Sequence, residues 1–146
     1  MNEEDRIVII VQHQDLEFLV FDHQPYKNPL LKFTPPHIRL GIWADVEEIE
    51  SHQQAIITLV DELHIEDAPR YLYGADHAER PDDRYYTRIG IYHHICQKKP
   101  TLEVNGSAPL WVAQEELIKY LHNREFYGES QTAFTYFNVL GPQPRN

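Results

Sequence analysis

Apolar residues along this chain fall into two patterns. The first is a short run, continuous or alternating, which is typical of a strand, and the second is a stripe with a helical period. The clearest strand is Arg6–Val11 (RIVIIV), a nearly continuous apolar run as in a strand covered on both faces. Leu16–Phe21 (LEFLVF) follows as its predicted hairpin partner. Further strands are predicted at His37–Asp45, Arg70–Gly74, Tyr85–Cys96 and Leu110–Val112.

Three segments carry apolar residues at helical spacing. In the first, Ser51 stands three residues before Gln54, which is the spacing of a capping box, and a broad apolar stripe follows. Two further helices are predicted, Gln114–Leu121 and one that Ser130 caps and that ends at Leu140 before Gly141. Strands mixed with helices that pack on a sheet predict an α+β fold, or equally a three-layer α/β/α sandwich.

Two long segments read as loops. Asp22–Pro36 carries several prolines, each of which fixes the backbone and removes a hydrogen-bond donor. Ala75–Arg84 (ADHAERPDDR) is charged and contains Pro81. No linker or repeat divides the sequence, so we expect residues 1–146 to form a single domain.

Composition narrows the classes of function. An apolar content of 42% is typical of a globular protein, and no run is long enough to cross a membrane. A net charge of −10 argues against a nucleic-acid partner, because binding to a phosphate backbone needs clustered lysine and arginine. The single cysteine, Cys96, excludes an intramolecular disulfide and predicts a cytoplasmic location.

Carboxylates gather on and around the first predicted helix. Asp61 and Glu62 lie opposite its apolar stripe, and Glu48 and Glu50 lie in the loop before it. Hard divalent cations take such oxygen ligands together with the phosphate oxygens of a substrate. Acids near a helix C-terminus can equally be a solvated face. The spacing alone leaves both interpretations open.

The segment Gly41–Ile65 resembles the signature of the Nudix hydrolases, a loop–helix–loop of pattern G-x5-E-x7-R-E-U-x-E-E-x-G-U in which U is apolar. Aligned from its end without gaps, Asp61 and Glu62 fall on the acidic pair, and Leu59 and Ile65 on apolar positions. The order of elements before it is also similar to that of the family. At five signature positions the chain departs from the pattern, with Trp43 for Gly, Ile49 for Glu, Ile57 for Arg, Thr58 for Glu and His64 for Gly.

This resemblance implies a Nudix-like mixed sheet with helices on both faces. It implies that Asp61 and Glu62 are the catalytic carboxylates and that they hold Mg²⁺ or Mn²⁺, with Glu48 or Glu50 in place of the loop glutamate. The implied ligand is a small phosphorylated molecule such as a nucleoside diphosphate derivative. A homodimer is also implied, because family members often pair.

Three functions follow from these residues. The departures favour a Nudix-fold protein with impaired or absent catalysis, which binds a nucleotide-like ligand or a protein partner. The first alternative is an active, Mg²⁺-dependent pyrophosphohydrolase of nucleoside diphosphates linked to another moiety. The second is an α+β interaction domain unrelated to the family.

Histidine and cysteine suggest one other kind of site. His93, His94 and Cys96 stand close together, and alternation along a strand directs His94 and Cys96 to the same face. Zinc, however, needs three or four convergent ligands, and the sequence offers no second ligand pair at metal spacing. We therefore interpret Cys96 as a small core residue.

Overall fold

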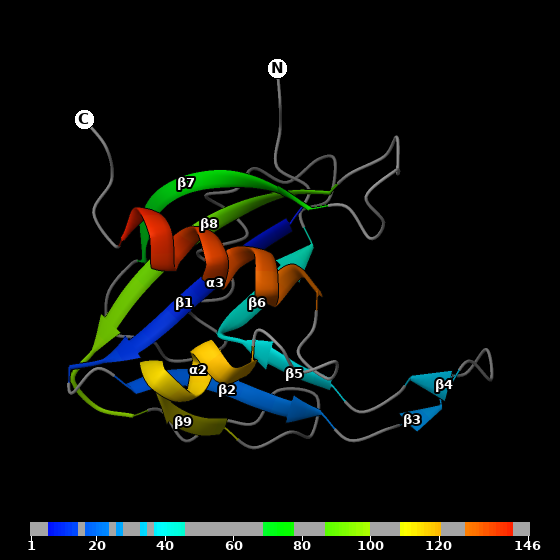
Figure 1. Cartoon of the computed structure of the whole chain (residues 1–146), viewed down its shortest axis with the longest axis horizontal. Coiled ribbons are helices and arrows are strands. Elements are labelled where there is room, and N and C mark those ends of the chain that lie inside the picture. The colour runs from blue at the N-terminus through cyan, green and yellow to red at the C-terminus, as the bar shows by residue number, and fades with distance from the viewer. Residues whose placement is uncertain are drawn as a thin grey trace.

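The computed structural model describes residues 6–14, 17–23, 26–27, 33–34, 37–45, 69–77, 87–99, 109–120 and 128–141. Within these ranges, seven strands form one mixed sheet, two short strands form a second sheet, and two helices pack on the first (Figure 1). The strands of the main sheet are β1 (Arg6–His13), β2 (Glu17–His23), β5 (His37–Leu40), β6 (Ile42–Asp45), β7 (Arg70–His77), β8 (Thr87–Cys96) and β9 (Pro109–Ala113), and the helices are α2 (Gln114–Tyr120) and α3 (Gly128–Leu140). Neither of these two helices has the length and apolar character that a membrane crossing requires.

Strand β1 is the centre of the main sheet. It pairs in parallel with β8 along its whole length, from Arg6 opposite Ile89 to His13 opposite Cys96. On its other side the first half of β1 pairs with β6, whereas its second half reaches β2 at Gln12. Its middle residues, from Ile7 to Val11, are all buried. The predicted strand covered on both faces is therefore confirmed.

Gly41 allows one extended segment to pair with two different strands, β2 and β1. Before it β5 pairs with β2, and after it β6 pairs with β1. Gly41 has φ +64° and donates its N–H to the carbonyl of Leu19 at 2.8 Å. A Cβ at this position would lie 2.1 Å from the carbonyl oxygen of Ile9, so only glycine fits. The single strand predicted over His37–Asp45 is therefore two strands joined by a glycine pivot.

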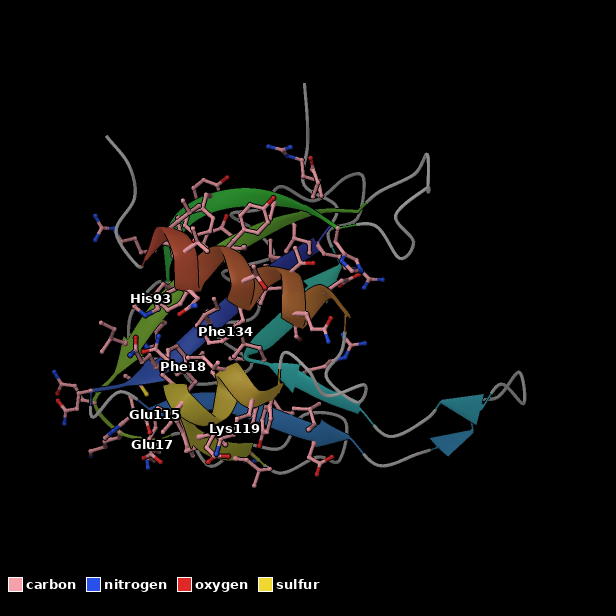
Figure 2. The ribbon with its side chains drawn as sticks, viewed as in Figure 1. Glu17, Phe18, His93, Glu115, Lys119 and Phe134 are labelled. Carbon is pink, nitrogen blue, oxygen red and sulfur yellow. The ribbon has the colours of Figure 1, made fainter. Side chains whose placement is uncertain are left out.

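Helices α2 and α3 cover the same face of the sheet, with α3 over β1 and β8 and α2 over β2 (Figure 1). The ring of Phe18 of β2 packs edge-on against two phenylalanines of α3, with ring centroids 6.1 Å from Phe134 (Figure 2) and 5.8 Å from Phe137. The buried cluster on this face comprises Val8, Ile10, Phe18, Val20, Ile38, Leu40, Leu72, Ala75, Ile89, Ile91, Leu117, Ala133, Phe134 and Phe137. This cluster fixes the position of α3 on the sheet.

The opposite face of the sheet is buried as well. Ile7, Ile9 and Leu19 have no exposed surface, and they do not belong to the cluster under α2 and α3. Their side chains alternate with those of the cluster, so they point to the other side of the sheet. The helix that the sequence predicts after Ser51 lies outside the described residues.

Two segments predicted as loops contain strands. Within Asp22–Pro36, β2 continues through His23, and β3 (Tyr26–Lys27) and β4 (Phe33–Thr34) form a separate two-stranded sheet to one side of the main one (Figure 1). Within Ala75–Arg84, β7 continues to His77 by pairing with β8. Both predictions were wrong at these points, because main-chain pairing with a neighbouring strand tolerates polar side chains, and these strands contain none of the prolines from which the loops were inferred.

Candidate functional site

The four carboxylates predicted as the site, Glu48, Glu50, Asp61 and Glu62, lie outside the described residues, so their placement stays a prediction. The structure does describe where their segment leaves the sheet and where it returns. It leaves after Asp45, which is opposite Arg6 in the register of β6 with β1.

The return point lies four residues further along the sheet, since β7 begins at Arg70 opposite His93, whereas Asp45 and Arg6 are level with Ile89. Strands β6 and β7 are parallel to each other, because β6 is antiparallel to β1, β8 is parallel to β1 and β7 is antiparallel to β8. Two parallel strands of one sheet can be joined only by a crossover connection. The orientations of β6 and β7 therefore imply a crossover connection between them.

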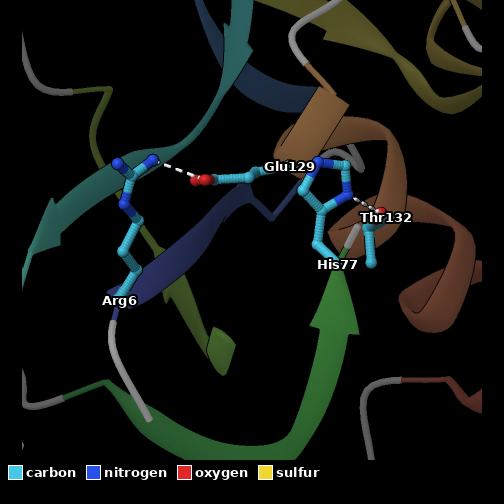
Figure 3. A network of polar contacts seen from close by, with 4 residues as sticks. All are labelled: Arg6, His77, Glu129 and Thr132. Atoms are coloured by element: carbon cyan, nitrogen blue, oxygen red, sulfur yellow. Dashed lines mark hydrogen bonds and ion pairs between the residues drawn. The ribbon is translucent and has the colours of Figure 1, made fainter. Parts of the chain in front are cut away.

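A network of polar contacts occupies the sheet end at which β6 finishes (Figure 3). The guanidinium of Arg6, the first residue of β1, donates from Nη1 to Oε1 of Glu129 at 2.5 Å. The side chain of Glu129 is only 5% exposed, and that of Arg6 is 27% exposed. At the end of β7, Nδ1 of His77 lies 2.8 Å from the hydroxyl oxygen of Thr132. Two strand ends are thus joined to the first turns of α3.

Ser130 makes a third connection between α3 and the sheet. Its hydroxyl oxygen accepts a hydrogen bond from the backbone N–H of Leu40 at 2.9 Å, and both residues are buried. Leu40 immediately precedes the Gly41 pivot, where the chain turns from β2 to β1. The predicted capping role of Ser130 is wrong, because α3 already begins at Gly128 and the hydroxyl serves a strand instead.

These contacts bring together residues that the sequence analysis did not associate with each other. The residues of the Arg6–Glu129 pair stand 123 positions apart in the chain, and no local pattern marks them as neighbours. Gly128 contributes through its lack of a side chain, since a Cβ there would lie 3.1 Å from Cε1 of His77. The network therefore positions α3 against the ends of β1 and β7, at the sheet end where β6 also finishes.

The other end of the sheet carries a buried histidine. His93 on β8 packs against Phe137, with ring centroids 5.2 Å apart, and the Nε2–H of its neutral ring donates to Oε1 of Gln12 at 3.0 Å. Burial, with smaller contributions from the neighbouring His94 and Arg70, lowers the pKa of His93 from 6.5 to about 4. His93 is therefore uncharged near neutral pH.

The remaining candidate metal ligands do not converge. His94 and Cys96 are buried at alternate positions of β8, and so on one face of it, as the alternation of the sequence indicated. Among the described residues, no three His, Cys, Asp or Glu side chains form a group that could hold a metal ion.

No family model and no curated protein sequence matches this chain. Solved structures resemble it over nearly its whole length. A mutT/nudix family protein from Listeria innocua is 13% identical, with a TM-score of 0.64 and coverage of 96% of this chain and 98% of that one. The NUDIX domain of Shewanella oneidensis NrtR, solved in complex with ADP ribose, is 10% identical, with a TM-score of 0.59 and coverage of 96% and 90%.

A third similar structure comes from a protein complex. The C-terminal domain of mouse MUTYH, solved with human PCNA, is 13% identical to this chain, with a TM-score of 0.61 and coverage of 99% and 94%. At these identities the likeness establishes the fold alone. This fold favours the Nudix-like architecture that the sequence predicted over an unrelated α+β architecture.

Proposed function

Because the chain has the Nudix fold, an α/β/α sandwich around a mixed sheet, we propose that it is a Nudix-fold protein with impaired or lost hydrolytic activity that binds a nucleotide-like ligand. The observation that carries this proposal is the content of the segment Gly41–Ile65. Three charged positions of the signature are occupied by Ile49, Ile57 and Thr58, none of which can coordinate a metal as a carboxylate or form an ion pair.

The placement of this segment supports a ligand site beside the sheet end. The orientations of β6 and β7 imply a crossover connection after Asp45, and α2 and α3 already cover one face of the sheet. The buried side chains of Ile7 and Ile9 on the other face need an apolar cover, which the stripe of the helix beginning near Ser51 would provide. Glu48 follows Asp45 by three residues, so chain length keeps its Cα within about 11 Å of the end of β6.

The donor set suits a hard cation. Asp61, Glu62, Glu48 and Glu50 offer carboxylate oxygens, which Mg²⁺ and Mn²⁺ accept together with the oxygens of a phosphate. When bound, such an ion would neutralise phosphate charge in a protein whose own net charge is −10 and would lower the pKa of a bound water. We assign these four residues as its ligands.

A second candidate function, an active Mg²⁺-dependent pyrophosphohydrolase of nucleoside diphosphates linked to another moiety, rests on Asp61 and Glu62 at the acidic pair of the signature. We rank it second because residues that support a metal site typically contribute about 10–100-fold each to affinity or activity. A protein that lacks three charged positions should lose more than one such factor.

Partner binding is a further form of the first proposal. Two structures with this fold illustrate the two kinds of ligand. The C-terminal domain of MUTYH was solved with the protein PCNA, and the NrtR domain was solved with ADP ribose. We also propose a homodimer and a cytoplasmic location, the latter because the sole cysteine, Cys96, is buried in a chain that cannot form an internal disulfide. Light scattering after size-exclusion chromatography and fractionation of cells test these two points.

Phosphate release from a panel of nucleoside diphosphate-linked compounds, with Mg²⁺ and with Mn²⁺, tests the main proposal. Wild type is compared with Glu62→Gln, and binding of the same compounds is measured by calorimetry. We expect binding without metal-dependent release. The active enzyme would instead be established if wild type turns over a compound and Glu62→Gln lowers that rate by more than about 99%. Such a loss corresponds to roughly 3 kcal/mol of activation barrier.

A full rate in Glu62→Gln would remove Glu62 from the reaction. Absence of both turnover and binding in a folded sample would contradict a nucleotide ligand and would direct the search to protein partners.

A further inference from the structure

The outer face of α3 carries no charge. From Ser130 to Leu140 the sequence contains no aspartate, glutamate, lysine or arginine, although 25% of the residues of the whole chain are charged. The exposed residues of this stretch form two adjacent pairs one turn apart, so they share one side of the helix, and they are Thr135, Tyr136, Asn138 and Val139. An exposed helix face usually carries charged groups, so this composition is typical of a contact surface.

Apolar surface is concentrated on the same face. Val139 is 74% exposed and Tyr136 is 37% exposed, and no large apolar side chain of the described residues is more exposed than Val139. The ring of Tyr136 lies against that of Tyr73 on β7, with centroids 6.4 Å apart, and the hydroxyl of Tyr73 donates to the carbonyl of Gly141 at 3.4 Å. Tyrosine is enriched and charge is depleted at the centre of protein interfaces, as on this face.

The helix that presents this face is fixed to the sheet. Phe134 and Phe137 are buried on its inner side, and Glu129 and Ser130 in its first turn bond to the first residue of β1 and to the main chain of β5. Figure 1 shows α3 on the outer side of the sheet. A contact with α3 therefore requires little further ordering of the chain.

We propose that this surface, the α3 face (Thr135, Tyr136, Asn138 and Val139), is where a second copy of the chain docks, with α3 against α3 across a two-fold axis. The inference rests on the homodimer proposed above and names its surface, and it does not involve the nucleotide site. In such a symmetric contact each copy offers the same residues, so the face has to be complementary to itself.

Charge selects a second copy as the occupant of the α3 face. A basic partner would be attracted to the acidic surface of a chain whose net charge is −10, and the α3 face offers it no carboxylate for an ion pair. A second copy brings an equally uncharged face, so the contact buries apolar side chains without burying an unpaired ion.

The size of the face and the net charge set the strength of the dimer. Helix α3 has 13 residues and is about 20 Å long, so a contact centred on it is smaller than the interface of a stable dimer, and we expect a weak, concentration-dependent association. Two acidic copies repel each other outside the contact, and salt screens this repulsion beyond a Debye length of about 8 Å. Added salt should therefore strengthen the dimer, whereas it weakens an association that ion pairs hold together.

Sedimentation velocity of the full chain from about 1 to about 500 µM measures the association. We expect Val139→Glu and Val139→Lys each to weaken dimerisation by at least about 10-fold, because each brings two like charges together near the axis. Leu110→Glu is the matched control, since Leu110 is also apolar and 45% exposed, lies on β9, and changes the net charge as Val139→Glu does. Its dimerisation should equal that of wild type.

An equal mixture of Val139→Glu and Val139→Lys tests whether both copies use the same face. Opposite charges then meet near the axis, so the mixture should regain the association that each variant alone has lost. A mixture that stays as weak as its components would overturn the docking of α3 against α3. Circular dichroism and thermal unfolding check each variant, and Thr135→Glu, one turn earlier on the same face, replaces any Val139 variant that does not fold.

The remaining outcomes separate the surface from the dimer. Dimerisation that Val139→Glu leaves unchanged would overturn the α3 face and leave the homodimer in place. A wild type that stays monomeric over the whole concentration range would overturn both, while binding of nucleotide compounds by the same sample would leave the proposed ligand site standing. A dimer that added salt weakens would contradict an uncharged contact.

Discussion

His93 makes the stability of the fold depend on pH in a way that a single substitution can isolate. The ring is 7% exposed between β8 and α3 and contacts Phe137 and Gln12. Burial lowers its pKa from 6.5 to about 4, with smaller contributions from His94 and Arg70. Protonation of the ring in the folded protein costs free energy because it places a charge in a buried site. In the unfolded chain the same ring gains its proton near pH 6.5.

The sign and size of the effect follow from linkage. Between pH 6.5 and about 4 the unfolded state binds more protons at this position than the folded state, so the free energy of unfolding rises with pH across this window. The contribution is complete above pH 6.5 and is lost as the pH falls toward 4. The whole pKa shift of His93 corresponds to about 3 kcal/mol of unfolding free energy. About 2 kcal/mol of this stabilisation is already lost at pH 5.

The assay compares wild type with His93→Leu by urea unfolding at pH values from 7.5 to 4.5. Leucine keeps an apolar contact with Phe137 and removes the titrating group, and Gln12 is half-buried and can turn to water. We expect the two proteins to differ by less than about 1 kcal/mol at pH 7.5. At pH 5 the variant should have gained about 2 kcal/mol relative to wild type.

All other titrating groups are common to both proteins, so the difference between the two profiles reports His93. Parallel profiles from pH 7.5 to 4.5 would refute the assignment of this pKa. Added salt should leave most of the difference in place, because burial and not the charge of Arg70 is its main cause.

Two further substitutions test the pivot and its connection to α3. Gly41→Ala should destabilise by more than about 3 kcal/mol in urea unfolding, because its Cβ meets the carbonyl oxygen of Ile9 at 2.1 Å. Gly141→Ala, also at positive φ but with no atom within 4 Å, should cost only about 1 kcal/mol, and equal costs would argue against the clash. Ser130→Ala should cost about 1–3 kcal/mol and speed hydrogen exchange of the Leu40 amide, and an unchanged exchange rate would contradict that bond.

Local pattern was sufficient for the central strand and the last helix. The apolar run at Arg6–Val11 predicted β1, since a strand buried on both faces needs apolar residues at every position. For α3, the predicted end before Gly141 was confirmed, and the N–H of Gly141 donates to the carbonyl of Phe137 at 2.8 Å. These features depend on neighbours within a few residues, which a sequence displays directly.

The candidate site was predicted only in part. Asp61 and Glu62 were identified from the spacing of a signature, and because they lie outside the described residues their position stays a prediction. The network at the sheet end where β6 finishes, with Arg6 bound to Glu129, was not predicted.

The sequence by itself determined the central strand Arg6–Val11, the end of the last helix before Gly141, and the gathering of acids in one segment. Only the tertiary structure decided that a strand splits at Gly41, that Ser130 serves Leu40 instead of its own helix, and that Arg6 meets Glu129. The physical reason is one of range. Period and capping arise from contacts within a turn or two, whereas these three features arise where strands and a helix distant in sequence share one sheet end.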